Sequence, residues 1–372
     1  MAKIQRAELS LVNLTPEVQR RDAVQAFESQ ETPILTVTDS DGASGTGYTY
    51  TIGAGGSSIV ALLRDRLLPK LMGAEAEDLE HTWRDLKMSI NALTIGPVAS
   101  LALAAIDTAL WDLRGRKAGL PLYRLAGGAN ERVPVYSTEG GWLQLSVEEL
   151  CQNAAECQRQ GFHGAKMKVG RPDWHEDKER LEAVRATVGP AWDIMVDANQ
   201  AFRYDEALRR TEAFSGSKPA WLEEPLPADD IAGHARLARH TAIPIAVGES
   251  LYSTMHFREY LQQGACSVVQ VDVARVGGIT PWLKVAHLAD CYNVAVAPHF
   301  LMEIHVSLAC AVPNGARLEH IPQLGSITAN EVVIADGYAY PPAAPGIGLE
   351  WDWDKIAHLA SDTVSVTASR EM

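Results

Sequence analysis

The sequence is poor in basic residues relative to its acidic content. Its 372 residues include 33 Lys and Arg but 47 Asp and Glu, which leaves a formal net charge of −14 at neutral pH. Surfaces that follow nucleic acid phosphates or anionic membranes normally carry the opposite sign. The charge balance therefore argues against nucleic acid or a membrane as the partner.

Cysteine is also scarce. The five cysteines are odd in number and none are spaced as Cys-x-x-Cys, so the sequence shows neither a disulfide framework nor a zinc site. Charges at Lys3, Arg6 and Glu8 argue against a signal peptide, and polar residues and a Gly-Pro pair interrupt the longest charge-free stretch, 88–106. We therefore expect a soluble, cytoplasmic protein with reduced thiols.

Several catalytic signatures are missing. There is no His-x-His of amidohydrolase-type metal sites, no His-Glu-x-x-His, and no Gly-x-x-x-x-Gly-Lys-Ser/Thr phosphate loop. The glycines between 42 and 56 do not form a dinucleotide-binding fingerprint and are typical of loops. The chemistry must therefore come from another arrangement of residues.

From about residue 133 the sequence alternates short apolar strands with helical segments. The ends of successive strands are 20 to 29 residues apart, which leaves room for one strand, one helix and short loops. This is the period of a (β/α) barrel. The eight predicted strands are 133–137, 165–169, 193–196, 220–222, 243–247, 268–271, 294–297 and 316–318.

The N-terminal part has a different pattern, with alternating strands followed by segments of helical spacing, which indicates a small α+β domain. From 323 onward the sequence returns to turns, and we expect this tail to pack back on the N-terminal domain. The predicted fold is thus α/β, a modified (β/α) barrel with an α+β capping domain. The expected parts are the cap at 1–128, the barrel at 129–322 and a C-terminal segment at 323–372.

Ionisable residues end almost every predicted barrel strand. In a parallel barrel the C-terminal ends of the strands form the catalytic face, whereas solvated charges would be scattered through the helices. This coincidence is the main evidence for a catalytic site. The residues are Lys166, Lys168, Asp197, Glu223, Glu249, Asp272, His299 and Glu319.

Three of these carboxylates predict a metal site. Asp197, Glu223 and Glu249 end three consecutive strands and would converge at the barrel mouth. Each alone is more typical of a helix cap or a loop, but three close carboxylates repel one another unless a cation bridges them. An oxygen-only ligand set favours Mg²⁺ over Zn²⁺.

The other strand ends predict acid/base groups. Lys166 and Lys168 point to one face of a strand, and their repulsion is expected to lower the pKa of at least one, although an isolated Lys-x-Lys is often solvated. Asp272 is placed to accept the Nδ1 proton of His299 and orient its ring. Lys168 and His299 would then flank a substrate carboxylate. Removal of its α-proton leaves an enediolate that Mg²⁺, Lys166 and a protonated Glu319 would stabilise.

At this point the sequence resembles the enolase superfamily, mandelate racemase subgroup, over nearly its whole length. The resemblance implies that Asp197, Glu223 and Glu249 bind Mg²⁺, that Glu224 does not, and that the protein is a homo-oligomer. It also implies that Lys168, His299, Asp272, Lys166 and Glu319 are catalytic and that Lys166 and Asn199 bind substrate. The motifs are Asp-Thr-Ala-Leu-Trp-Asp at 107–112, Lys-Met-Lys at 166–168, Val-Asp-Ala-Asn-Gln at 196–200, Trp-Leu-Glu-Glu-Pro at 221–225, Gly-Glu at 248–249, Gln-Val-Asp at 270–272 and Ala-Pro-His at 297–299.

Within the subgroup the stretches 168–172, 230–234, 274–279 and 298–305 are most similar to acid-sugar dehydratases of the galactarate/talarate type. This implies dehydration of an aldarate or aldonate to a 2-keto-3-deoxy acid. In the loop 15–27, Arg20 or Arg21 is a candidate to bind a distal carboxylate or hydroxyl of the sugar acid, and a solvated loop arginine is an equally good interpretation.

Two other functions remain open. A racemase or epimerase of a 2-hydroxy acid would use the same Lys168 and His299 pair, because bases on both faces allow a proton to return from either side. A non-catalytic metal-binding barrel is disfavoured, because a site freed from catalysis has no reason to keep the complete set of strand-end residues.

Overall fold

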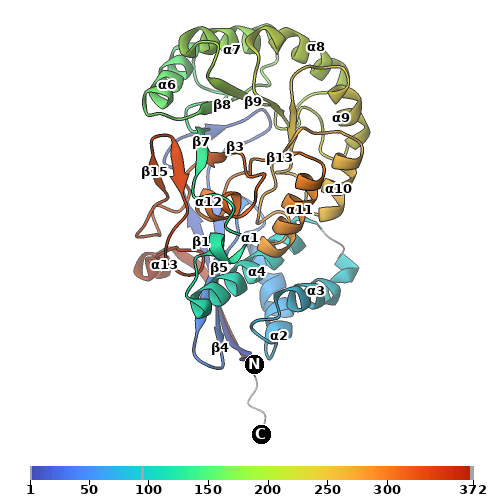
Figure 1. Cartoon of the computed structure of the whole chain (residues 1–372). Helices are drawn as coiled ribbons and strands as arrows, with labels where there is room; N and C mark the ends of the chain where they lie inside the picture. Colours follow the sequence, from blue (N-terminus) through green and yellow to red (C-terminus); the bar gives the residue numbers. More distant parts are fainter. Residues whose placement is uncertain (1, 94–95, 369–372) are drawn as a thin grey trace.

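The computed structural model describes residues 2–93 and 96–368 and consists of a barrel and a capping domain (Figure 1). This is the α/β architecture expected from the sequence. Among the described residues, none of the helices combines the length and the hydrophobicity that a membrane span requires.

The cap is built on an antiparallel sheet of order β17–β1–β4–β5, with β6 paired to β4. Helix α4 lies so close to β5 that a Cβ at Gly47 would be 2.3 Å from the backbone nitrogen of Ala109. A π-helical turn, Leu63–Leu67, joins α1 to α2, and a 3-10 turn, Asn91–Leu93, follows α3. The elements are β1 (Ile4–Leu14), β4 (Gln30–Asp39), β5 (Ser44–Tyr48), β6 (Thr51–Ile52), α1 (Gly56–Leu62), α2 (Leu68–Leu71), α3 (Leu79–Ser89), α4 (Pro97–Ala118), α5 (Leu122–Leu125) and β17 (Ala360–Thr367).

The barrel contains eight parallel strands, and neighbours in the sequence pair from β7 to β13. It closes because β14 pairs with β7, and Gly315, just before β14, bridges to Val296 of β13. The strands are β7 (Val133–Ser137), β8 (Gly164–Lys168), β9 (Asp193–Asp197), β10 (Leu222–Glu223), β11 (Ile245–Val247), β12 (Val268–Val269), β13 (Ala295–Val296) and β14 (Leu318–His320).

The helices α6 to α11 form the outer wall of the barrel, whereas the fully buried α12 lies between the barrel and α5 of the cap (Figure 1). A 3-10 turn, Ser215–Ser217, follows α8. The helices are α6 (Val147–Arg159), α7 (Trp174–Val188), α8 (Tyr204–Phe214), α9 (Ile231–Ala238), α10 (Thr254–Gln262), α11 (Ile279–Cys291) and α12 (Met302–Ala311).

The C-terminal tail does not pack on the cap as one unit, which corrects the expectation for 323–372. Its last strand, β17, pairs with β1 of the cap, next to helix α13 (Trp353–Leu359). However, β15 (Val333–Ala335) and β16 (Tyr338–Tyr340) extend the barrel sheet. The reason is that β8 and β14 engage only residues 135–137 of β7, which leaves its first two residues free to pair with β16.

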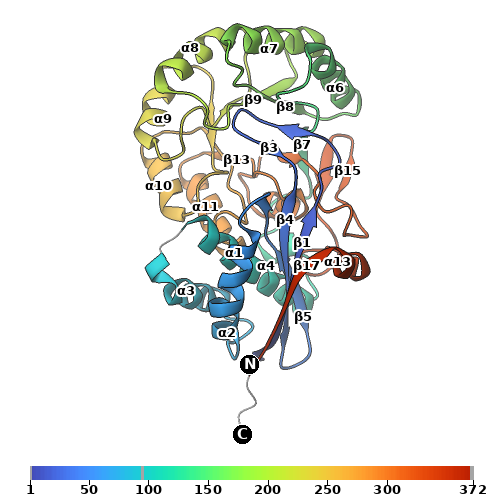
Figure 2. The same ribbon diagram turned by 180° about the vertical axis from the view of Figure 1, so that it is seen from behind.

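A hairpin of the cap, β2 (Arg20–Arg21) and β3 (Ala26–Phe27), extends to the barrel mouth (Figure 2). The backbone nitrogen of Leu143 donates to the carbonyl of Arg21 at 2.9 Å. The loop of the hairpin lies against Gly170, because a Cβ there would be 2.5 Å from the Cβ of Ala23. The cap therefore reaches the residues that follow the C-terminal end of β8.

Asp107 connects the cap to the barrel. From α4 its Oδ2 accepts the backbone N–H of Thr280 at 2.8 Å, in the first turn of α11, while its Oδ1 is buried without a partner. Gly278 makes room for it, because a Cβ at that position would lie 2.4 Å from Oδ2. Burial raises the pKa of Asp107 to about 7, against the effect of the hydrogen bonds from Thr280.

Replacing Asp107 by Asn should make stability less sensitive to pH. Because its folded-state pKa of about 7 exceeds the ordinary 3.8, the folded protein takes up a proton between these pH values and the unfolded chain does not. The wild type should therefore gain about 2–4 kcal/mol relative to the variant as the pH falls through this range. Urea denaturation at several pH values measures the difference, with the exposed Asp354→Asn as control. Parallel pH profiles of wild type and Asp107→Asn would contradict this role of Asp107.

Candidate active site

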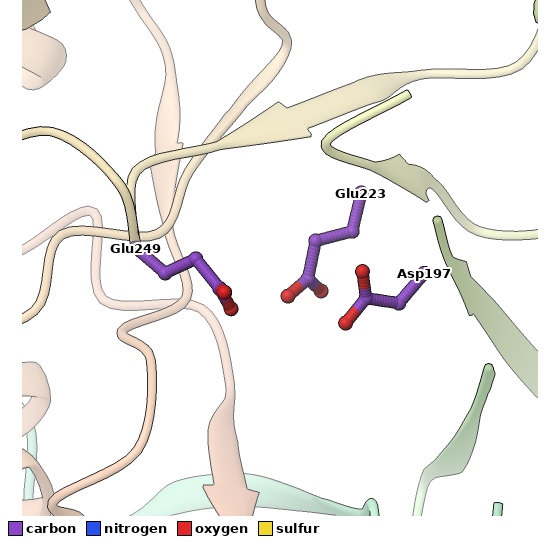
Figure 3. A group of neighbouring side chains, drawn as sticks. All are labelled: Asp197, Glu223 and Glu249. Carbon is purple, nitrogen blue, oxygen red and sulfur yellow. The ribbon is translucent and has the colours of Figure 1, made fainter. Parts of the chain in front are cut away.

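Three buried carboxylates from neighbouring strands converge at the barrel mouth (Figure 3). Asp197 and Glu223 end β9 and β10, and Glu249 lies two residues after β11. Ligand oxygens of the three lie within 4.8 Å of one another. Burial and then repulsion from Asp197 raise the pKa of Glu223 to about 8. A crowded, oxygen-only set of this kind fits Mg²⁺, as the sequence predicted.

The two lysines of β8 face these carboxylates. Nζ of Lys166 lies 2.9 Å and 3.0 Å from the two carboxylate oxygens of Glu223 and 2.8 Å from Oε1 of Glu319. Nζ of Lys168 donates to Oδ2 of Asp197. Burial lowers the pKa of both lysines, but attraction to the carboxylates outweighs it and raises both values. Repulsion from Lys166 does lower the pKa of Lys168, as the sequence suggested, but attraction to Asp197 is the larger effect.

Asp272 and His299 form the expected pair. Oδ2 of Asp272 is 2.9 Å from Nδ1 of His299, and Nε2 of the same ring is 2.9 Å from Oε2 of Glu249. The hydroxyl of Tyr50, from the cap, donates to Oδ2 of Asp272 at 2.7 Å. Burial lowers the pKa of His299, but Glu249 and Asp272 raise it to about 10. The ring is thus an imidazolium that can donate a proton.

His305, which sequence reasoning did not single out, links the loops that carry this pair. Its Nε2 accepts the backbone N–H of Val273 at 3.0 Å, and its Nδ1 lies 3.2 Å from the carbonyl oxygen of Phe300. Burial lowers the pKa of His305 to about 4, so the ring stays neutral and accepts this bond. It holds the residues next to Asp272 and His299 in register.

Glu319 is a carboxylate rather than the protonated donor expected from the sequence. Its Oε1 accepts from Thr138 and faces Lys166, and its Oε2 accepts the backbone N–H of Phe300 at 2.9 Å. Although burial raises its pKa, Lys166 and the other donors lower it to about 2. A site whose neighbours are all donors stabilises the ionised form.

Residues beside the triad have different orientations. Asn199 donates its backbone N–H to Oδ1 of Asp197 at 2.9 Å, and its own Oδ1 is buried without a partner. Gln270, part of a quoted motif, donates to Oε2 of Glu223 at 2.6 Å. Glu224 instead accepts from the backbone N–H and hydroxyl of Ser250, at 3.2 Å and 3.0 Å. Glu224 is therefore outside the triad, in line with the sequence prediction.

The structure does not bring Arg20 or Arg21 to the triad. The buried guanidinium of Arg20 donates to Glu139, to Gln323 Oε1 at 2.8 Å and to the carbonyl of Pro322 at 3.1 Å. Arg21 is exposed. Pairing of Arg20 with Glu139, 119 residues away, was not visible in the sequence.

The hairpin residue that approaches Lys168 is Asp22. Its Oδ1 accepts the backbone N–H groups of Val24 and Gln25, at 2.7 Å and 2.8 Å, and its Oδ2 is buried without a partner. Burial raises the pKa of Asp22, and the nearby Lys168 opposes this shift. Its signal in the sequence was its place in the loop 15–27, next to the candidate residues Arg20 and Arg21.

Comparisons with known proteins agree with this geometry. Residues 9–127 match the family model of the mandelate racemase/muconate lactonizing enzyme N-terminal domain, and residues 149–355 match the enolase C-terminal domain-like model. The chain is 36% identical over 328 residues to 3,6-anhydro-alpha-L-galactonate cycloisomerase of Streptomyces coelicolor, covering 88% of this chain and 90% of that one.

It is also 36% identical over 316 residues to L-talarate/galactarate dehydratase of Salmonella typhimurium, covering 85% of this chain and 79% of that one. A crystal structure of this dehydratase with Mg and L-lyxarohydroxamate superimposes with a TM-score of 0.94 at 32% identity, covering 99% of this chain and 95% of that one. The similarity therefore extends over both the cap and the barrel.

The adjacent residues Glu223 and Glu224 provide a matched test of the metal site. Glu223→Gln should weaken Mg²⁺ binding at least about tenfold, because it removes a ligand charge, whereas Glu224→Gln should leave it within about twofold. Isothermal titration calorimetry of the metal-free proteins with Mg²⁺ measures both. Equal losses in the two variants would show that the triad does not define the metal site.

Proposed function

The chain belongs to the mandelate racemase/muconate lactonizing enzyme family of the enolase superfamily, and we propose that it dehydrates an acid sugar, an aldarate or aldonate, in a Mg²⁺-dependent reaction. The observation that carries the proposal is the placement of Lys168 and His299. Lys168 ends β8 and His299 follows β13, and the strands β9, β10 and β11 that carry the acidic triad lie between them in the sheet.

Lys168 is placed to take the proton on the carbon next to the substrate carboxylate, from the side of β8. Attraction to Asp197 raises its pKa, so Lys168 would act as the base when Mg²⁺ at the carboxylates offsets this attraction and the amine can lose its proton. Breaking this C–H bond leaves an enediolate, and Lys166, on the same face of β8, can donate to its oxygens. Bound at Asp197, Glu223 and Glu249, Mg²⁺ supplies positive charge that offsets the developing negative charge.

His299 acts in the second half of the reaction. Its imidazolium is oriented by Asp272 and can give the Nε2 proton to the hydroxyl on the β-carbon. The C–O bond then breaks, water leaves, and the resulting enol tautomerises to a 2-keto-3-deoxy acid. The raised pKa of His299 supports this role, since only the protonated ring can act as the acid.

The names of the relatives support the substrate class. The cycloisomerase acts on an anhydrogalactonate and the dehydratase on talarate and galactarate, so both substrates are carboxylic acids of the sugar series. A racemase or epimerase of a 2-hydroxy acid is the second candidate, because Lys168 and His299 can exchange a proton on opposite faces of one carbon.

Loss of either acid/base group should abolish activity. Against an acid-sugar panel with Mg²⁺, Lys168→Ala and His299→Asn should each lower kcat for keto-acid formation by about 10²–10⁴-fold, because each transfers a proton in the reaction. Lys178→Ala, a half-buried lysine on α7 that pairs with Glu182, serves as control and should retain wild-type activity.

The same assay separates the alternatives. Deuterium uptake at the α-carbon with inversion and no keto acid would replace dehydration by racemisation. Unchanged activity in Lys168→Ala would remove that residue from the proposal.

A further inference from the structure

A cavity of about 350 Å³ opens beside the triad where the cap meets the barrel. Its volume is suitable for a small sugar acid. The barrel contributes Glu249 and Asn199, among others, and the cap contributes residues from three segments. All described cap residues that line it are uncharged, and most are apolar: Val24, Ile52, Ala54, Ile59, Val98 and Leu101.

Among the described lining residues, Arg275 is the one cation, and its guanidinium already contacts other groups of the protein. Its Nε donates to the hydroxyl of Tyr50 at 3.1 Å, and its Nη1 donates to the carbonyl of Glu249 at 2.8 Å. Nε also lies 3.9 Å from Oδ2 of Asp272. The bond from Nε holds the cap against the barrel, and the bond from Nη1 lies within the barrel. Because these nitrogens are engaged and the carboxylate of Asp272 opposes the charge, Arg275 is a poor receptor for a second substrate carboxylate.

The rest of the mouth is rich in acceptors. Lys166 and Lys168 already face Glu223, Glu319 and Asp197, at the end where the reacting carboxylate belongs. Asp22 adds a further buried carboxylate near Lys168, and its Oδ2 lacks a partner, as does Oδ1 of Asn199. Such acceptors suit hydroxyl groups and repel a second carboxylate.

A second cavity, of about 260 Å³, lies around Arg20 and offers no better receptor. Arg20 is the one cation among its described lining residues, and its donors are taken by Glu139, Gln323 and Pro322. Glu139, Glu303 and two further glutamates line the same space. The net charge of the residues that line this cavity is therefore negative.

We infer that the substrate carries a single carboxylate and that its far end is uncharged. This rests on the proposed function and narrows it from acid sugars in general to aldonates and related monocarboxylic acids. A second carboxylate placed against the neutral cap wall would lose its hydration without gaining a cation. Sugar hydroxyls would instead donate to the free acceptors of Asp22 and Asn199.

Matched acids of identical configuration test this inference, for example gluconate with glucarate and galactonate with galactarate. Calorimetric binding to the Mg²⁺-loaded enzyme and kcat/KM for keto-acid formation are measured in parallel. We expect a preference of at least about tenfold for a monocarboxylate over its matched dicarboxylate.

Binding and keto-acid formation test the single-carboxylate inference and the dehydratase proposal separately. Equal or tighter binding of dicarboxylates overturns the single-carboxylate inference, even when keto acid forms. Binding of monocarboxylates without any keto acid overturns the dehydratase proposal but keeps the inference. Absence of binding by every acid overturns both.

A charge placed in the wall provides a second test. Val24 lines the cavity and is 62% exposed, and Val333, on β15 outside it, is 63% exposed. Val24→Lys should raise kcat/KM for a dicarboxylate relative to its monocarboxylate about fivefold, while the control Val333→Lys should not. Identical ratios in the two variants would show that charge on the cap wall does not set the preference.

Discussion

The crowding of three buried carboxylates at the barrel mouth is the constraint on which the site depends. Oxygens within 4.8 Å of one another, removed from water, need positive charge nearby. In this structure Lys166, Lys168 and His299 provide it, and the pKa of each is raised in consequence. A ligand that enters the site therefore changes the electrostatic interactions between these three cations and the carboxylates. Mg²⁺ fits because it can neutralise the carboxylates, which leaves Lys166, Lys168 and His299 available for the reaction.

The barrel part of the site could be predicted because parallel strands fix where their last side chains lie. Asp197 and Glu223 end paired strands in the same register, so a strand assignment accurate to one or two residues was enough to place them. Asp272 and His299 follow neighbouring strands in the same way. The spacing of the predicted strands along the sequence was therefore enough to place these four residues.

The contribution of the cap could not be predicted, because it depends on contacts between residues far apart in the sequence. Tyr50 reaches Asp272 across 222 positions, and Arg20 is neutralised by a glutamate after β7. The protonation states of the lysines and of Glu319 could not be predicted for a similar reason. The sequence showed Lys166 beside Lys168, but not the carboxylates that surround both, and the expected protonated Glu319 lies among donors. A pKa is set by all neighbours together.

The proposed function requires an acidic protein to bind an anionic substrate, and the barrel and the cap would contribute to this binding in different ways. With a net charge of −14, the protein offers little general attraction to anions, so affinity must come from local cations. These are concentrated on β8, where they serve one carboxylate. The cap adds uncharged walls and the acceptor Asp22, which in our inference would distinguish substrates by the groups they carry beyond that carboxylate. The cap also contacts Asp272 through Tyr50, and Asp272 pairs with His299. In the proposed reaction, the domain that contacts the far end of the substrate would therefore also orient the acid His299.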